Sequence, residues 1–541
     1  MNGSRQPGPG PGYRSTKAGP DALIIGGGHN GLTCAWYLAR AGLKVRILER
    51  RSIVGGAAVT EEFHPGFRNS TASYTVSLLQ AKVITDMRLH DWGLRIVHRP
   101  VSNFLPFDDR RYLILGGGLE RTQAEVAKFS ARDAATLPAY YEALERMADV
   151  LRDLALKTPP NAGGGLTDMM RAAAQGWSVA KLGIEAQRDL LDLFTKSARD
   201  FLDGWFESDE LKAAFGFDAV VGNYASPETP GSAYVLLHHV FGEVNGVKGA
   251  WGHAIGGMGA ITQAMARACE AAGVEIETRA PVARVLVDGG MAVGVALEDG
   301  REVHARRIIA NVGPKLLYES LVDTSDLPAD FARRMKSYKA GSGTFRMNVA
   351  LSELPRFTCL PEPGVHLASG IVIAPSLDYM DRAFTDARRD GWSRQPIVEM
   401  LIPSTLDDTL ALPGSHVASL FCQQFAPVLP GGRSWAEARE AAADHIIDTV
   451  DAYAPGFKAS VLGRLALSPA DLEERFGLAG GDIFHGAMSL DQLWAARPVL
   501  GHGAYAGPIR HLWMCGAGTH PGGGVTGAPG HNCAREVIRS L

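Results

Sequence analysis

The sequence predicts an α/β fold, α+β overall, in which a Rossmann-type domain carries an inserted domain of mixed sheet and helices. A short apolar run, 22–25, leads through glycines into a segment with helical spacing and then into a second apolar run. Such strand–helix–strand units are typical of parallel sheets. Glycine is also in excess, at 63 of 541 residues, and 23 of these lie within 26–56, 246–259 and 501–530. Because no Gly-X-Y period accompanies the excess, collagen is excluded, and we expect backbone to approach a ligand or another element closely.

The first folded unit begins at Asp21. Ala22–Ile25 is apolar throughout, which predicts a buried parallel strand. Residues 30–41 repeat apolar side chains at helical spacing, and 44–48 predict a second strand that ends at Glu49.

The rest of the chain alternates in character. Residues from about 119 to 215 are mostly helical by periodicity, while 340–425 are mostly strand-like. Further helices are predicted over 260–272, 435–453 and from about 527 to the C-terminus. Further strands are predicted over 274–278, 281–287, 291–297, 306–310, 344–351, 370–374 and 511–515.

Composition excludes several classes of protein. Lys and Arg number 54 against 58 Asp and Glu, a net charge of −4, so we expect no nucleic-acid partner. Six scattered cysteines form no C-x-x-C pair and the histidines form no metal-binding pattern, so we expect no metal, no redox dithiol and a cytoplasmic location. No apolar run is long enough to span a bilayer. Residues 1–20 are rich in Pro and Gly and are expected to form a disordered lead-in.

The glycine loop after the first strand matches G-x-G-x-x-G at Gly26, Gly28 and Gly31. The first glycine suits a tight turn, the second lets backbone touch a pyrophosphate, and the third allows close packing of helix on strand. Glu49 follows Gly26 by 23 residues and can accept hydrogen bonds from a ribose hydroxyl, which disfavours NADP. The helix N-terminus supplies N–H donors for the phosphates.

Two further glycine segments favour FAD over NAD. Gly55 and Gly56 follow the acidic residue directly, and 516–524 are again rich in glycine, between a predicted strand and a predicted helix. A cofactor that needs bare backbone at both ends of the chain is longer than NAD requires, and FAD has that length.

At these segments the chain resembles the phytoene-desaturase-type branch of the amine-oxidase-like flavoproteins, and desaturase-type carotenoid ketolases are similar too. The resemblance rests on IIGGGHNGL, ERRSIVGGAAVTEE, GGMGAIT, FHGAMSLDQLWAARP and CGAGTHPGGGVTGAPGHNCA. It implies an FAD domain over 21–100, 250–315 and 495–541, and a substrate domain over 101–249 and 316–494. Gly116–Arg121 lacks the last glycine of a second fingerprint, so we expect no separate NAD(P)H domain.

The fingerprint and the resemblance together imply one set of FAD-binding residues. It comprises Gly26, Gly28, His29, Asn30, Gly31, Glu49, Arg50, Arg51, Gly55, Gly56, Ala57, Val282, Gly516, Gly518, Gly524, Val525 and Thr526. If the last helix points its N-terminus at the flavin, its dipole stabilises the reduced ring.

The expected activity is transfer of a hydride from a C–H bond of an apolar or amine-type small molecule to flavin N5, with reoxidation by an external acceptor. A desaturase or ketolase acting on a polyene is one alternative, and a non-enzymatic regulatory or carrier protein of this fold is another. Catalytic groups stay open, with His520, His531 and Tyr74 as the candidates. The partners considered are a small apolar substrate, a membrane surface and a second copy of the chain.

Overall fold

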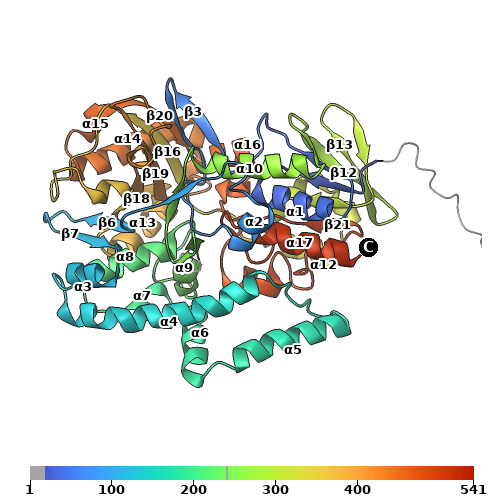
Figure 1. The fold of residues 1–541 in the computed structure, drawn as a ribbon, viewed down its shortest axis with the longest axis horizontal. Helices are drawn as coiled ribbons and strands as arrows, with labels where there is room; N and C mark the ends of the chain where they lie inside the picture. Colours follow the sequence, from blue (N-terminus) through green and yellow to red (C-terminus); the bar gives the residue numbers. More distant parts are fainter. Residues whose placement is uncertain (1–18, 239, 241) are drawn as a thin grey trace, which may run out of the picture.

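The computed structural model describes residues 19–238, 240 and 242–541, so most of the expected lead-in lies outside the described residues. Among the described helices, none combines the length and the apolar character needed to cross a bilayer. Two lobes lie side by side, one built on a parallel sheet and one on a larger mixed sheet (Figure 1).

The parallel sheet has five strands in the order β11-β2-β1-β15-β21, and each neighbouring pair is parallel. Its strands are β1 (Ala22–Ile25), β2 (Val45–Leu48), β11 (Glu275–Glu277), β15 (Ile308–Ala310) and β21 (Leu512–Met514). They come from both ends and the middle of the chain, and their carboxyl ends share one edge. Ligands of open α/β sheets bind at such an edge.

Three helices pack together beside this sheet: α1 (His29–Arg40), α10 (Met258–Ala271) and α17 (Ala528–Arg539). Glycine permits their close approach. A Cβ atom at Gly530 would lie 2.1 Å from the carbonyl oxygen of Asn30, and one at Gly31 would lie 2.4 Å from that of Gly26. Part of the glycine excess therefore serves the packing of helices rather than a ligand.

The second lobe is built on a seven-stranded sheet in the order β20-β16-β19-β18-β17-β6-β7. Its strands are β6 (Asn103–Pro106), β7 (Tyr112–Leu115), β16 (Phe345–Leu351), β17 (Gly370–Ile373), β18 (Trp392–Leu401), β19 (His416–Phe425) and β20 (Val461–Leu467). Only β17 and β6 pair in parallel, so the sheet is mixed, as predicted.

The remaining strands form smaller sheets. They are formed by β3 (Thr60–His64) with β4 (Phe67–Ser70), β5 (Ile96–His98) with β10 (Gly252–Ala254), β8 (Glu243–Val244) with β9 (Val247–Lys248), and β12 (Val282–Asp288), β13 (Met291–Leu297) and β14 (Glu302–His304) together. The hairpin predicted around Asp288 is confirmed.

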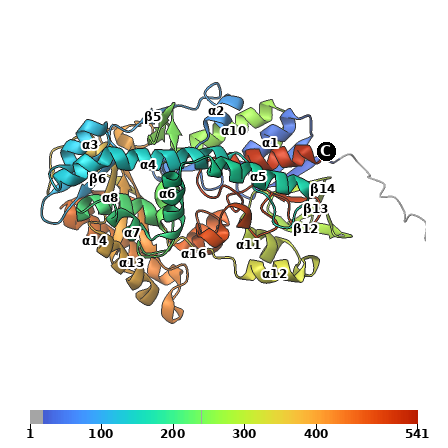
Figure 2. The same ribbon diagram turned by 90° about the horizontal axis from the view of Figure 1, so that it is seen from below.

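Helices cover both lobes, and α4 with α5 runs along one side of the molecule (Figure 2). They are α2 (Ala81–Asp86), α3 (Leu119–Val126), α4 (Ala131–Ala155), α5 (Leu166–Ala180), α6 (Ile184–Thr195), α7 (Ala198–Asp203), α8 (Asp209–Val220), α9 (Ala233–His238), α11 (Pro314–Leu316), α12 (Ala329–Lys336), α13 (Leu377–Asp390), α14 (Trp435–Tyr453), α15 (Phe457–Ser460) and α16 (Pro469–Phe476). The helix predicted over 435–453 has those bounds. The domain boundaries stay a prediction.

Two glycines in helices test the packing argument. We expect Gly530→Ala to lower the melting temperature, because overpacking against the backbone of α1 costs about 1–3 kcal/mol. Gly176→Ala in α5 is the matched control: its Cβ would meet nothing within 4 Å, and alanine favours a helix by up to about 1 kcal/mol. Thermal unfolding followed by circular dichroism measures both. An unchanged or raised melting temperature for Gly530→Ala would contradict the packing role.

Candidate FAD site

A cavity of about 410 Å³ opens at the carboxyl ends of β1, β2 and β15. Many residues predicted to bind the cofactor line it. They are Gly26, Gly28, His29, Asn30, Glu49, Arg50, Arg51, Gly56, Ala57, Val282, Gly524 and Val525. The edge of the parallel sheet therefore brings together backbone from four distant parts of the chain.

The glycine loop forms the floor of this cavity. Gly28 caps α1 without any side-chain hydrogen bond to the helix, and its backbone bridges to Gly55. The amide of Gly55 donates to the carbonyl oxygen of Gly27 at 2.9 Å. A Cβ atom at Gly28 would lie 2.8 Å from Nδ2 of Asn311 and 3.9 Å from the Cα atom of Gly56. Only bare backbone on both sides leaves room for a pyrophosphate at the helix N-terminus.

Glu49 joins two segments of the site. Its Oε2 atom accepts a hydrogen bond from the amide of Gly27 and its Oε1 atom accepts one from the amide of Arg51, each at 2.8 Å. The carboxylate is 5% exposed and faces the cavity. Since each carboxylate oxygen accepts more than one hydrogen bond, Glu49 keeps capacity for ribose hydroxyls.

Unpartnered polar atoms gather around the cavity. In the described part of the chain, nine buried side-chain nitrogen or oxygen atoms have no hydrogen-bond partner, and four of them belong to residues that line this cavity. They are His29 Nε2, Asn30 Oδ1, Arg51 Nη1 and His485 Nδ1. Buried polar atoms are normally paired, because an unmade hydrogen bond costs about 1–3 kcal/mol. Donors and acceptors in this arrangement fit a phosphate-containing dinucleotide such as FAD.

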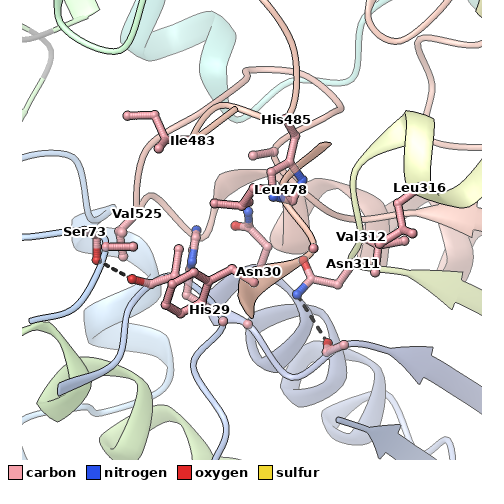
Figure 3. Close-up of a pocket in the computed structure, with 18 of the residues that line it drawn as sticks. His29, Asn30, Ser73, Asn311, Val312, Leu316, Leu478, Ile483, His485 and Val525 are labelled. Carbon is pink, nitrogen blue, oxygen red and sulfur yellow. Dashed lines mark hydrogen bonds between the residues drawn. The ribbon is translucent and has the colours of Figure 1, made fainter. Parts of the chain in front are cut away.

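Two histidines in this cavity are neutral at physiological pH. Burial lowers the pKa of His29 to about 4, although a hydrogen bond to the backbone of Gly524 acts in the opposite direction. Burial and the charge of Arg497 lower the pKa of His485 to about 4. In Figure 3, Ser73, Ile483 and Val525 lie on one side of His29, and Val312 and Leu316 lie on the other. The imidazoles thus stand between the two ends of the cavity.

Five predicted residues support the cavity without lining it. A Cβ atom at Gly31 would meet the carbonyl oxygen of Gly26, one at Gly55 would lie 2.7 Å from that of Ala58, one at Gly516 would lie 3.2 Å from that of Asn311, and one at Gly518 would lie 2.3 Å from Cδ of Pro314. Thr526 Oγ1 accepts a hydrogen bond from the amide of Ala528 at 3.1 Å, which fixes the turn that leads into α17. These residues hold the loops and helices in place.

His520 and His531 do not line the cavity. His520 is 5% exposed, and its Nε2 atom lies 3.0 Å from the carbonyl oxygen of Leu154. His531 Nδ1 lies 2.9 Å from Oδ1 of Asn532, and the His531 ring packs edge-on against Tyr37. Both side chains are therefore engaged in packing away from the cavity.

Tyr74, the third catalytic candidate, lines the cavity at the end that also includes Val525. Its hydroxyl donates to Glu399 Oε2 at 2.5 Å, its ring stacks on Phe421 with centroids 5.2 Å apart, and the Arg346 guanidinium lies 4.5 Å from its ring centroid. Arg346, Phe421 and Glu399 are cross-strand neighbours on β16, β19 and β18. Three adjacent strands thus set the orientation of Tyr74.

Burial shifts the pKa of each polar group in this cluster. It raises the pKa of Glu399, against the charges of Arg99 and Arg346 and the hydrogen bond from Tyr74, which lower it. Burial and then the charge of Glu399 raise the pKa of Tyr74 well above its ordinary value. The phenol therefore keeps its proton at neutral pH and donates it toward the carboxylate.

Sequence reasoning missed other residues of the cavity wall. Asn311 follows β15 directly, and its Nδ2 atom donates to the carbonyl oxygen of Gly26 at 3.2 Å. Its position after a predicted parallel strand was a usable signal, because the carboxyl ends of such strands share an edge. His485 lies in the FHGAMS segment, which was part of the resemblance but was given no role. Trp251 and Phe421 carried no local signal.

Comparison with known proteins identifies the family of this chain. The model of the family "Flavin containing amine oxidoreductase" matches residues 31–345. The rat protein "Pyridine nucleotide-disulfide oxidoreductase domain-containing protein 2" is 41% identical over 96% of this chain and 94% of its own. One of the subunits of limonene dehydrogenase from Castellaniella defragrans is 27% identical over 96% and 95%, and the lycopene-forming phytoene desaturase of Pantoea ananas is 24% identical over 94% and 96%.

Solved structures agree on the fold. An oxidoreductase from Methanosarcina mazei superposes with a TM-score of 0.59 at 16% identity, covering 96% of this chain and 99% of its own. The expected flavoprotein fold and the resemblance to phytoene desaturases are confirmed. The chain belongs to the flavin-containing amine oxidoreductase family and is an FAD-dependent oxidoreductase.

Proposed function

We propose that the protein dehydrogenates an apolar, hydrocarbon-type small molecule, with removal of a hydride and a proton from neighbouring carbon atoms. The observation that carries this proposal is the wall of the cavity beyond His29. It is formed mainly by apolar and aromatic side chains, namely Leu78, Val221, Trp251, Phe421, Ile483, Phe484 and Val525 together with the ring of Tyr74. The charged side chains that line the cavity, Glu49, Arg50, Arg51 and Glu298, belong to the dinucleotide end.

The names of two relatives support an apolar substrate. Limonene and phytoene are both hydrocarbons without an ionisable group, and the proteins named after them match this chain over nearly its full length. An amine is the second candidate, because the family description names amine oxidoreductases. Ketolation of a polyene is a further variant of the hydrocarbon proposal.

The cavity residues divide the binding of FAD among them. Glu49 would hold the ribose next to the adenine, the amides after Gly28 would hold the pyrophosphate, and Arg51 Nη1 would supply a further donor. Val525 and Gly524 would border the flavin. When bound, FAD accepts a hydride from a substrate C–H bond and passes its two electrons to an external acceptor, so the neighbouring C–H bond has to lose a proton to the protein.

We assign the acceptance of that proton to Tyr74 and Glu399. The oxygen of Tyr74 takes the proton from carbon as its own proton passes to Glu399 Oε2 across the 2.5 Å hydrogen bond, and a C=C bond forms in the substrate. Burial raises the pKa of Glu399, and the positive charge of Arg346 beside the ring acts in the opposite direction, toward the carboxylate form that accepts the proton. Phe421 fixes the ring by stacking.

Anaerobic reduction of the bound flavin tests the substrate class. We expect limonene or phytoene in detergent to bleach the flavin absorbance of the purified holoenzyme, because an apolar wall desolvates a hydrocarbon at little cost. Putrescine, a charged amine, is the comparison compound and should leave the flavin oxidised. Bleaching by putrescine and not by the hydrocarbons would overturn the proposed substrate.

A branched side chain at Gly28 tests where the cofactor binds. Gly28→Val places methyl groups between Asn311 and Gly56, where the pyrophosphate has to lie, so we expect at least a tenfold loss of bound FAD. The ratio of flavin to protein absorbance measures this. Gly176→Val is the control, since its Cβ would meet nothing within 4 Å. If folded Gly28→Val retains its full FAD content, the assigned position of the pyrophosphate is wrong.

Tyr74→Phe tests the proton acceptor. It removes the hydroxyl while keeping the stacking on Phe421, so FAD content should persist while substrate-driven flavin reduction slows by about 10²–10⁴-fold. Stopped-flow absorbance under anaerobic conditions provides the rate. Tyr141→Phe on the exposed side of α4 is the control and should reduce at the wild-type rate. An equal rate for Tyr74→Phe would exclude the hydroxyl from the reaction.

A further inference from the structure

Helix α5 is amphipathic, but its polar face packs against the protein and its apolar face is exposed to solvent. Leu166, Met169, Met170 and Trp177 are 71%, 66%, 57% and 65% exposed. These positions and Ala173 recur at steps of three and four residues, which places them on one face of the helix. Figures 1 and 2 show α5 lying along the outside of the molecule beside α4.

The opposite face of α5 is anchored by polar contacts. Arg171 Nη2 forms an ion pair of 2.8 Å with Glu536 of α17, and Gln175 Nε2 donates to the carbonyl oxygen of Thr158 at 2.9 Å. The hydroxyl of Thr158 donates to the other oxygen of Glu536 at 2.7 Å. These bonds fix the rotation of α5 about its own axis, so the fold itself holds the apolar stripe toward solvent.

The exposed stripe is large enough to matter. At roughly 100 Å² of exposed apolar surface for each of its four large side chains, the stripe exposes on the order of 400 Å². Apolar patches of a few hundred Å² on soluble proteins mark interaction surfaces. That area is about half of the roughly 800 Å² that each partner contributes to a stable interface.

The chemistry of the stripe favours a second copy of this chain over an anionic membrane. The segment 166–196 contains four acidic and four basic residues, so it has no net charge to attract anionic lipid. Lys181 lies 5.9 Å from the Trp177 ring centroid, but it stands at the end of the helix rather than along the stripe. A neutral apolar face of this kind can match itself.

The order of side chains along α5 suits a two-fold axis. The middle of the helix carries only small residues on its outer side, Ala172, Ala173 and Ala174, and the large side chains lie toward its two ends. We propose that two copies of the chain associate through α5, with the two helices antiparallel and crossing at Ala173. At the axis the small residues let the backbones approach closely, and Trp177 of one copy packs against the Leu166 end of the other.

Solution mass and a charge placed at the crossing test this proposal. We expect wild-type holoenzyme to sediment at twice the 57.7 kDa chain mass, and Ala173→Glu to weaken association by tenfold or more, because an unpaired charge would be buried at the axis. Val428→Glu is the matched control: Val428 is 84% exposed and lies outside α5, so this variant should stay dimeric. FAD content should be unchanged in both variants, and the melting temperature should be unchanged in Val428→Glu. A monomeric wild type, or an Ala173→Glu variant that associates like the wild type, would overturn the proposal.

A crosslink gives a second readout should Ala173→Glu fail to fold. Ala173→Cys should form a disulfide-linked dimer under mild oxidation that reductant reverses, since residues at a two-fold axis face their own copies. Wild type should not, because five of its six cysteines are buried and the sixth, Cys359, is only partly exposed. Absence of crosslinking in Ala173→Cys would overturn the two-fold contact. Cosedimentation of a monomeric wild type with phosphatidylglycerol vesicles through this face would also overturn it, and would assign α5 to a membrane.

Discussion

The hydrogen bonds of the buried Glu49 carboxylate are the constraint on which the FAD site depends. One oxygen holds the amide of Gly27 and the other holds the amide of Arg51, so the loops that follow β1 and β2 cannot separate. The backbone bridge from Gly28 to Gly55 joins the same two loops a second time. Without these hydrogen bonds the amides after Gly28 would not converge on one position. The unpartnered side-chain atoms around them, such as His29 Nε2 and Arg51 Nη1, could then not contact the same ligand. Glu49 is thus a structural residue as well as a ribose acceptor.

The parallel sheet could be predicted because its information is local. Four of its five strands are short runs that are mainly apolar, the edge strand β11 alternates as Glu-Ile-Glu, and the first strand is followed by a glycine fingerprint with a fixed geometry. Glycine clustering was a weaker guide to individual contacts. Gly518 and Gly530 meet Pro314 and the backbone of Asn30, so they serve element packing, whereas Gly28 and Gly56 face the cavity. Composition alone cannot separate these two uses of glycine, since both require a missing Cβ atom.

The substrate end of the cavity could not be predicted for a different reason. Tyr74 and Glu399 are 325 residues apart and meet only because β16, β19 and β18 place Arg346, Phe421 and Glu399 in one cross-strand row. Strand register of this kind depends on pairing across the whole sheet. The direction in which α5 faces is likewise set by its partners, because helical periodicity shows that a helix has two faces but not which one meets the protein. Here Glu536 and Thr158 decide it.

The two ends of the cavity differ in chemistry because they are made from different kinds of structure. Loops after parallel strands present backbone amides and a helix N-terminus, which suit phosphate and ribose. The other end is lined mainly by apolar and aromatic side chains, to which the mixed sheet contributes Phe421, and the Tyr74 hydroxyl beside it donates to Glu399 of the same sheet. His29 and His485 stand between the ends as neutral imidazoles, since burial lowers the pKa of each to about 4. Protonation of either below that pKa would place a positive charge between the phosphates and the apolar wall. The same burial lowers the free energy of unfolding as the pH falls from about 6.5 toward 4. In that range these two histidines bind protons in the unfolded chain but stay neutral in the folded protein.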